Sequence, residues 1–410
     1  MADFVEEVRP IDECVNFVAD SLSFPWKVRE RKVDLCAALF MRSSRDVRAG
    51  EPSPPFTRSL RDGYALSHSI TTGASPGSPI FLKVRGEVVM GEAPTFALFA
   101  DEAAFIPTGG MVPDGADAVV MLEDTEAAGG VVELRRAVQR GENLIFIGEE
   151  IAPGDILLSA GEMIDCSIPG ILGTFGIFSV DVVDLKIGVI STGDEILPID
   201  ASPLPIGSIR DANTYSVQSL LRRYGWASRS YGIAPDNPED LTALANEAIG
   251  ECDVVLLSGG SSVGARDHTA RILDSLSEPG PLIHGINMTP GKPTLIGGSI
   301  SDKKLIVGLP GHPLSCMVST IFVVMPILLA MSGARGSHVG RYLKMRLAED
   351  VQGRTGPDEL IPMKISEEGA APLAAKSSYV SAMRGADGFI RLRPNTETLR
   401  KYDETEIWLW

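Results

Sequence analysis

The chain has 410 residues, of which 44% are hydrophobic and 22% are charged, the balance of a soluble globular protein. Since domains usually hold roughly 100–200 residues, this length predicts two to four domains. The formal net charge is -17. So acidic a surface repels nucleic acid phosphates and anionic lipid, which argues against both as partners, and an anionic substrate needs a local positive pocket.

The cysteines and the first residues predict a reducing, cytoplasmic location. The five cysteines are scattered and form no CxxC pair, which argues against a disulfide framework and against a zinc site. Residues 1–20 carry acidic side chains and lack the basic segment of a signal peptide. The longest apolar run, 316–331, is short for a membrane span and contains Pro326, so it predicts a buried helix.

The N-terminal part of the chain shows two kinds of pattern. Residues 1–50 have a partial helical period, and a proline cluster at 52–55 then interrupts the chain. Residues 56–149 contain short β-type runs separated by Gly and Pro, as in a compact β domain. We therefore expect a discontinuous helical linker domain from 1–55 and 150–182, interrupted by an inserted β domain over 56–149.

Residues 183–333 predict an α/β domain. Nearly continuous apolar strands alternate with helices, which indicates a mostly parallel sheet covered by helices on both faces. The predicted strands are 186–190, 228–233, 252–257 and 305–309, and predicted helices follow Asn213, Asn237 and Asp267. Residues 338–410 return to β-type runs and predict a C-terminal, barrel-like β domain. The expected fold class is thus multidomain α/β plus β, with a central three-layer α/β domain.

Ligands of an open parallel sheet bind at the carboxyl ends of the strands, so the loops after the strands are the candidate site. The first loop, Ser191-Thr192-Gly193-Asp194-Glu195, places two hydroxyls, a glycine and two acids directly after a buried strand. These residue types suit either a ligand site or a turn that caps a helix, and the sequence leaves both readings open.

The second loop, 258–267, reads SGGSSVGARD. Its glycines allow a ligand to approach the backbone, its N–H groups can form an anion nest, and the helix that follows adds positive potential. The loop matches neither the Walker A nor the GxGxxG nucleotide fingerprint. Asp267 either caps the helix or holds a magnesium ion beside phosphates.

Two further loops are stiffened by proline. Residues 288–293 read MTPGKP, and Lys292 is the only charge among them. A fixed lysine in an acidic protein suits an anion site, although a solvated lysine on a turn gives the same pattern. Residues 308–315 read GLPGHPLS and predict a tight turn onto a helix. His312 in this turn is more often a polar loop residue than a ligand.

These four loops, in this order, resemble those of the MoeA family, which includes the molybdopterin molybdenumtransferases and the E domain of gephyrin. Three earlier motifs extend the resemblance over nearly the whole chain: RDGYA at 61–65, IPTGG at 106–110 continuing into GADAVV at 115–120, and GEN at 141–143 with GEEI at 148–151. Each motif alone is weak, but seven in order are specific.

The resemblance implies an elongated four-domain subunit in which 183–333 is a MogA-like α/β domain that binds substrate. It implies a homodimer whose clefts lie between the α/β domain of one subunit and the β domain of the other. The implied enzyme is a transferase that takes adenylylated molybdopterin and molybdate as substrates. It yields molybdenum cofactor and AMP, with Mg²⁺ assisting. A MogA-type adenylyltransferase is the implied transient partner.

The resemblance also implies roles for individual residues. Asp236 and Asp267 would bind Mg²⁺, which offsets phosphate charge and aids the departure of AMP. Glu195 would act as an acid–base or metal-orienting group, Asp62 would reach in from the other subunit, and Lys292 would hold molybdate. Molybdate is itself an attacking oxyanion, so no Ser or Cys nucleophile is required. The implied substrate-binding residues are Thr108, Thr192, Gly193, Ser258, Gly259, Gly260, Ser262, Gly264, Pro290, Gly291, Pro293, Pro310, Gly311 and Ser315.

Several positions depart from the family pattern. The family commonly has Lys or Arg where Thr289 stands, arginines in place of 144–146, and Asn where His312 stands. It often has an Arg in the strand expected at 359–365. The lost positive charges bear on the strength of oxyanion binding and on the choice between molybdate and tungstate.

Three alternative functions stay open: a tungstate-preferring paralogue, a MogA-like molybdopterin adenylyltransferase, and a non-catalytic cofactor-binding scaffold. The adenylyltransferase resembles only 183–333, so the DGYA motif and the other residues outside that range favour the molybdate-inserting enzyme. A scaffold could lose its acidic and lysine residues freely, so retention of Asp62, Glu195, Asp236, Asp267 and Lys292 argues for chemistry.

Overall fold

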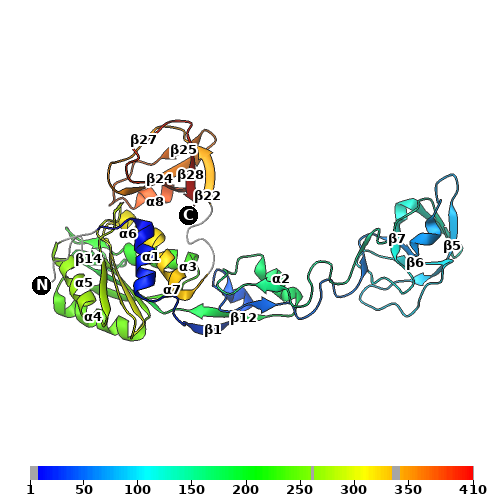
Figure 1. The fold of residues 1–410 in the computed structure, drawn as a ribbon, viewed down its shortest axis with the longest axis horizontal. Coiled ribbons are helices and arrows are strands. Elements are labelled where there is room, and N and C mark those ends of the chain that lie inside the picture. Colours follow the sequence, from blue (N-terminus) through cyan, green and yellow to red (C-terminus); the bar gives the residue numbers. More distant parts are fainter. Residues whose placement is uncertain (1–7, 260–262, 335–341, 410) are drawn as a thin grey trace. The chain divides into compact units, whose positions relative to one another are not determined.

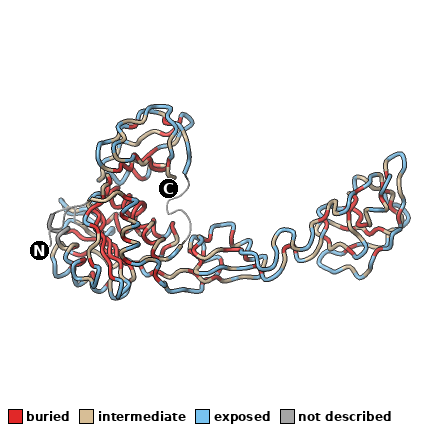
Figure 2. The backbone as a smooth tube through the Cα atoms, in the orientation of Figure 1, coloured by how far each residue is buried: buried red, intermediate tan, exposed pale blue. Residues whose placement is uncertain are grey.

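The computed structural model describes residues 8–259, 263–334 and 342–409, which form two compact units (Figure 1). The first unit comprises Met1–Asp46, Leu158–Gly173 and Ile177–Trp410, and the second comprises Val47–Leu157 with Thr174–Gly176. Each unit buries its own hydrophobic core, drawn in red in Figure 2.

The second unit is built on a six-stranded sheet with the order β7-β4-β6-β5-β9-β8, in which only β5 and β6 are parallel. Its strands are β4 (Gly63–Leu66), β5 (Ile80–Glu87), β6 (Glu102–Ile106), β7 (Ala118–Met121), β8 (Thr125–Ala128) and β9 (Val131–Leu134). Shorter elements are β2 (Val47–Arg48), β3 (Arg58–Ser59), β10 (Leu144–Ile145) and the 3-10 turns His68–Thr71 and Leu122–Asp124. The short β-type runs of the sequence are therefore present as strands.

A second six-stranded sheet organises the first unit, with the order β16-β13-β17-β21-β20-β18. Its strands are β13 (Ile187–Thr192), β16 (Ser228–Ala234), β17 (Val254–Gly259), β18 (Pro279–His284), β20 (Leu295–Ser299) and β21 (Lys304–Leu309). The first four in spatial order are parallel, which confirms the mostly parallel sheet. The antiparallel edge of β20 and β18 is not evident in the sequence, because glycine and proline, both weak strand formers, interrupt these segments.

Helices cover both faces of this sheet (Figure 1). One face packs against α4 (Pro238–Glu251) and α5 (Val263–Asp274), and the other against α1 (Ile11–Ser21) and α3 (Asn213–Arg223). Successive strand side chains alternate between the faces, so Val189 contributes to one core and Ile190 to the other. Because both faces of the sheet are covered, nearly every residue of its central strands is apolar, which is the pattern seen in the sequence.

The apolar run at 316–331 lies within a continuous helix, Pro313–Ser332. It consists of α6 (Pro313–Ser319), a π-helical turn (Thr320–Val324) and α7 (Met325–Ser332). The helix is long and apolar enough to cross a membrane, but 89% of its apolar window is buried inside the structure. It is therefore a core helix of the α/β sheet, as predicted.

The N-terminal segment is less helical than the sequence suggests. The helix α1 packs into the core of the α/β sheet through Ile11 and Val18. The helical prediction for the residues that follow is wrong, because β1 (Arg29–Asp34) pairs antiparallel with β12 (Ser179–Asp184). The pairing partner lies far along the chain, so a local helical period carries no sign of it. The remaining linker elements are the 3-10 turn Leu35–Ala38, β11 (Ile156–Leu158) and α2 (Ile168–Thr174).

The C-terminal segment forms a sheet with the order β19-β24-β26-β28-β22, and β25 also pairs with β24. An isolated bridge between Leu347 and Ala370 joins the residue after β22 to β25. The strand β19 comes from the α/β segment, just before Lys292. The elements are β19 (Met288–Thr289), β22 (Tyr342–Arg346), β23 (Val351–Gln352), β24 (Asp358–Ser366), β25 (Gly369–Pro372), α8 (Ser381–Gly385), β26 (Gly388–Leu392), β27 (Thr398–Leu399) and β28 (Glu404–Leu409).

Candidate functional site

The four predicted loops meet at one edge of the α/β sheet. Thr192, at the end of β13, pairs with Ala234 of β16 on one side and with Gly259 of β17 on the other. Leu295, at the start of antiparallel β20, pairs with Gly308 near the end of β21. The loop that precedes β20 therefore lies at the carboxyl ends of the parallel strands, where ligands of such sheets bind.

A chain of hydrogen bonds connects the first loop with the residue after β16. The buried Thr192 hydroxyl donates to Asp236 Oδ1 at 2.9 Å, and the Asp236 N–H donates to Asp194 Oδ1 at 2.9 Å. Glu195 is exposed, and its Oε2 lies 2.9 Å from where a Cβ on Gly193 would stand. A side chain at Gly193 would therefore displace the Glu195 carboxylate.

The glycine of the second loop is required by its geometry. Gly259 has a φ of +148, and a Cβ there would stand 2.2 Å from the Thr192 carbonyl oxygen. This close approach brings the ends of β13 and β17 together. Gly260 and Ser262 lie outside the described residues, and only the backbone of Gly264 and Asp267 is described, within α5.

The loop that carries Lys292 is held by buried hydrogen bonds. The Ile286 N–H donates to the Lys292 carbonyl at 2.9 Å, and the Thr294 hydroxyl donates to the Gly291 carbonyl at 2.7 Å. The Lys292 side chain is exposed, and its ammonium has no partner among the residues that the structure describes. The backbone of this loop is therefore fixed, and the Lys292 ammonium that it carries is available to bind an anion. Pro290 and Pro293, half-buried, flank it.

The last loop is tied to the rest of this edge. The amide of Asn213, at the start of α3, donates to the Gly311 carbonyl at 2.8 Å, next to the buried Pro310. Ser315 is buried in the first turn of α6. The neighbouring Cys316 lies against Ser258, with Sγ and Oγ 3.7 Å apart, and burial raises the pKa of its thiol to about 12. A neutral thiol is a poor nucleophile, in keeping with a mechanism that needs none.

The C-terminal segment contacts this loop at a point that the sequence did not reveal. The Leu314 N–H donates to the Ser377 carbonyl at 3.0 Å, and the Ser377 hydroxyl lies 3.0 Å from His312 Nδ1. The structure thus gives His312, which the sequence predicts to be a polar loop residue, a partner from the C-terminal segment. The two residues are 65 positions apart, so no local signal could have joined them.

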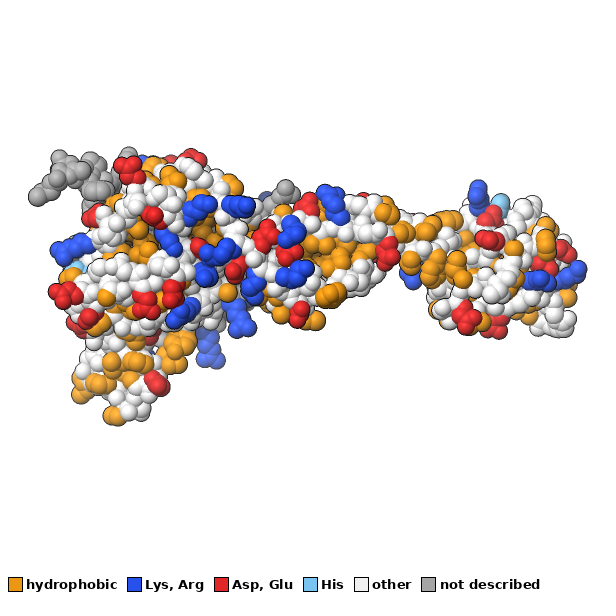
Figure 3. Space-filling view, turned by 90° about the horizontal axis from the view of Figure 1, so that it is seen from below, with side chains coloured by type: hydrophobic (Ala, Val, Ile, Leu, Met, Phe, Trp, Pro, Cys, Tyr) orange, Lys and Arg blue, Asp and Glu red, His pale blue; other side chains and the backbone are white. Residues whose placement is uncertain are grey.

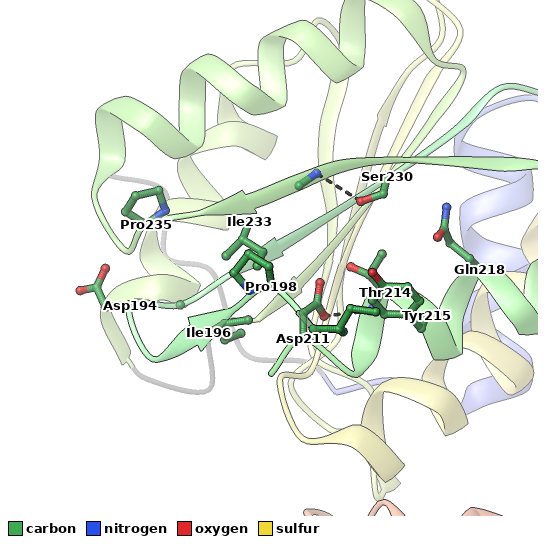
Figure 4. Close-up of a pocket in the computed structure, with 13 residues that line it drawn as sticks. Asp194, Ile196, Pro198, Asp211, Thr214, Tyr215, Gln218, Ser230, Ile233 and Pro235 are labelled. Carbon is green, nitrogen blue, oxygen red and sulfur yellow. Dashed lines mark hydrogen bonds between the residues drawn. The ribbon is translucent and has the colours of Figure 1, made fainter. Parts of the chain in front are cut away.

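A cavity of about 520 Å³ opens beside the first loop (Figure 4). Its apolar wall comes from the segment after β13 and from the end of β16, and its polar wall comes from the start of α3. The lining residues are Gly193, Asp194, Ile196, Pro198, Ile199, Asp211, Thr214, Tyr215, Gln218, Ser230, Gly232, Ile233 and Pro235. Sequence reasoning singled out only Gly193 among the candidate site residues, because the polar residues of α3 read as an ordinary helix start.

Asp62 and Thr108 lie together in the second unit. The Thr108 N–H and hydroxyl both donate to Asp62 Oδ1, at 2.6 and 2.9 Å. The hydrogen bond from the Thr108 backbone, followed by that from its hydroxyl, holds the pKa of Asp62 below the ordinary 3.8. The carboxylate of the DGYA motif is therefore ionised, exposed and fixed in orientation by its neighbour.

Figure 3 shows the distribution of charge on one face of the molecule. Acidic and basic side chains are interspersed on the face shown in Figure 3, in a chain of net charge -17. Among the described residues, no three His, Cys, Asp or Glu side chains gather as a metal site.

Comparisons of the sequence and the fold with known proteins show which family the chain is similar to. The family model described as "MoeA N-terminal region (domain I and II)" matches residues 9–176, and that described as "Probable molybdopterin binding domain" matches residues 188–330. The molybdopterin molybdenumtransferase of Bacillus subtilis is 32% identical, over 78% of this chain and 74% of the relative. That of Nostoc sp. is 31% identical, over 78% and 73%. The crystal structure of the molybdopterin biosynthesis MoeA protein from Pyrococcus horikoshii OT3 superposes with a TM-score of 0.85 at 26% identity, covering 98% of this chain and 100% of that one.

An α/β sheet with long loops at its carboxyl edge, an inserted β unit and a C-terminal β sheet occur together in a class of multidomain molybdopterin-biosynthesis proteins. The chain belongs to the MoeA family, whose members include the molybdopterin molybdenumtransferases.

Proposed function

We propose that this protein is a molybdopterin molybdenumtransferase, which inserts molybdate into adenylylated molybdopterin and releases AMP. The observation that carries the proposal is the Thr192–Asp236 hydrogen bond at the carboxyl edge of the sheet, where Gly259 packs closely on Thr192, in a domain that matches this family. The reaction replaces two oxygens of molybdate by the dithiolene sulfurs. One oxygen leaves as water with the two thiol protons, and the other adds to phosphorus as the phosphoanhydride breaks and AMP departs. The reaction therefore needs a place for phosphates, a place for an oxyanion and acidic groups near both.

Mg²⁺ is part of the proposal. Asp236 offers a half-buried carboxylate whose Oδ1 is oriented by Thr192 and whose Oδ2 has no partner among the described residues. Mg²⁺ prefers oxygen ligands and is commonly held by one or two carboxylates together with substrate phosphates, so Asp236 with Asp267 suits it. Bound there, the ion would offset the charge of the phosphoanhydride.

The chain's own residues would position the two substrates. Backbone N–H groups of the Gly-rich sequence 258–264 would hold the phosphates, as the sequence predicts, since successive backbone N–H groups can bind anions. The Lys292 ammonium, on a backbone fixed by Ile286, would hold the oxyanion with Ser315. Glu195, exposed beside Gly193, would supply an acid–base group.

The assembly is proposed from the family resemblance. The protein would be a cytoplasmic homodimer in which Asp62 of one subunit completes the cleft of the other, and it would receive substrate from a MogA-type adenylyltransferase. The fixed, ionised state of Asp62 supports a role in a site rather than in a core. Four functional domains are proposed: 1–55 with 150–182, 56–149, 183–333 and 338–410. A tungstate preference is the second candidate, because Thr289 stands where the family resemblance leads us to expect a cation.

Substitution of Asp236 tests the proposal. Asp236→Asn keeps the acceptor for the Thr192 hydroxyl but removes the negative charge, so AMP release should fall by roughly 100-fold or more while binding of adenylylated molybdopterin remains. Asp200→Asn, on an exposed residue of the α/β domain between β13 and α3, is the matched control and should keep full activity. Equal activity of both variants would refute the role of Asp236.

A further inference from the structure

The cavity beside the first loop contains a buried carboxylate that the proposed reaction has not used. Asp211 is 6% exposed, and its Oδ1 accepts from the Ser191 hydroxyl at 2.9 Å and from the Thr214 N–H at 3.1 Å. Its Oδ2 has no hydrogen-bond partner, and no Lys or Arg pairs with it, among the residues that the structure describes. Because Asp211 lines the cavity and its Oδ2 is not enclosed by the fold, this free acceptor favours a ligand that brings hydrogen-bond donors.

The rest of the cavity suits a flat ring. Ile196, Pro198 and Ile233 lie together beside Asp211 in Figure 4, and Pro235 continues this apolar side. Apolar walls of this kind pack against ring faces, while a few placed polar groups fix the orientation of the ring edge. The volume of about 520 Å³ is in the range of small-molecule sites.

We propose that this cavity binds the pterin ring of the substrate, with its aminopyrimidinone edge on Asp211. The assignment rests on the proposed function, which supplies a substrate with two heterocycles, a pterin and an adenine. The pterin edge presents two adjacent donors, N3–H and the 2-amino group, which match a carboxylate. The adenine edge presents one amino group flanked by ring nitrogens that accept, and these repel a carboxylate. Asp211 therefore selects the pterin.

The neighbouring backbone is consistent with this orientation. Gly193 lines the cavity and directly follows Thr192, which pairs with Gly259. A pterin in the cavity would place the rest of the substrate toward the Gly259 turn, where the proposed phosphate site begins. The adenosine would then lie beyond that turn and outside the cavity.

Separate binding measurements on the two halves of the substrate test the assignment. The probe for one half is 6-hydroxymethylpterin, followed by its own fluorescence, and the probe for the other is AMP, followed by calorimetry. Asp211→Asn should weaken pterin binding by roughly 10- to 100-fold, the range for loss of hydrogen bonds to a charged group, and leave AMP binding unchanged. Asp200→Asn, an exposed residue that does not line the cavity, should change neither.

A second variant guards against a folding effect of Asp211→Asn. Ser230 is an exposed residue on the edge strand β16 and lines the cavity, so Ser230→Tyr should fill it without touching the core and should abolish pterin binding. Loss of AMP binding with pterin binding intact would overturn the assignment, as would unchanged pterin binding in both variants. Asp211-dependent pterin binding by a protein that releases no AMP would refute the proposed catalysis and leave the pterin site standing.

Discussion

Asp62 shows how a single neighbour sets the state of a candidate site residue. Two hydrogen bonds from Thr108 lower its pKa, the backbone bond being the larger cause. A carboxyl whose pKa is lower in the folded state stabilises the fold fully above the ordinary value of 3.8. That stabilisation is lost as the pH falls through the folded value, so the loop should stay ordered at neutral pH and loosen in acid.

Replacing Thr108 with Val tests this account of Asp62. The variant removes the hydroxyl bond and keeps the backbone bond, so the pKa of Asp62 should rise but remain below 3.8. Carboxyl NMR titration measures it. Thr125→Val, which removes a hydroxyl bonded to the Leu122 carbonyl, serves as the control. An Asp62 titration identical in wild type and Thr108→Val would contradict the assignment.

Gly259 is the position at which a methyl group should be most harmful to the sheet edge. A Cβ would stand 2.2 Å from the Thr192 carbonyl oxygen, at a φ of +148 that other residues rarely adopt. Gly259→Ala should lower the free energy of unfolding by about 1–3 kcal/mol. Gly250→Ala, in α4 with open space around it, should raise it by up to about 1 kcal/mol.

Tryptophan fluorescence in urea provides the measurement. All four tryptophans belong to the first unit, so the signal reports on the sheet that holds Gly259. Equal stability of the two alanine variants would show that the close approach at Gly259 is not needed.

The site was predictable from sequence only where it is local. The Thr192–Gly193 and Gly259 turns follow apolar strands directly, and their motifs are continuous in the chain. Asp211 and the His312–Ser377 contact were not predictable, because their meaning comes from partners that folding brings from other segments.

Among the elements, predictability follows the length and continuity of the apolar pattern. The strands β13, β17 and β21 are buried on both faces and read clearly as strands. The strand β1 has one buried residue in six, so it shows no apolar alternation in the sequence. It forms by pairing with the distant β12, and its sequence alone was therefore misread as helical. Short or solvent-facing strands carry little signal of their own.

A buried ion pair within the C-terminal sheet also contacts α1. Arg391 donates to both oxygens of Asp358, at 2.9 and 3.0 Å, and to Asp12 of α1 at 2.8 Å. The side chains of Arg391 and Asp358 are 6% and 1% exposed. Because this pair is bidentate and almost fully buried, removal of one partner leaves the other as an unpaired charge in the interior.

Arg391→Met should therefore lower the free energy of unfolding by about 3–5 kcal/mol. Arg393→Met is the matched control, since Arg393 also contacts Asp12 but is 66% exposed, and it should change stability by less than about 1 kcal/mol. Urea unfolding followed by tryptophan fluorescence compares them. Comparable losses in the two variants would mean that burial does not set the strength of this pair.

For the whole molecule, the proposed shared cleft predicts complementation between two inactive variants. In a hybrid dimer of Asp62→Asn and Asp236→Asn subunits, one cleft would receive both intact carboxylates. Mixing the two after reversible dissociation should restore about one quarter of wild-type activity, because half of the dimers are hybrids with one working cleft. A mixture as inactive as its components would place Asp62 and Asp236 in the same subunit's site.

The central claim is tested most directly by AMP release from adenylylated molybdopterin. The purified protein is supplied with Mg²⁺, and molybdate and tungstate are titrated in separate series. The account predicts that AMP appears only with an oxyanion, and that molybdate half-saturates at the lower concentration. Lower half-saturation by tungstate would favour the paralogue. No AMP with either oxyanion, despite tight binding of the adenylylated pterin, would contradict the enzyme and leave a cofactor-binding scaffold.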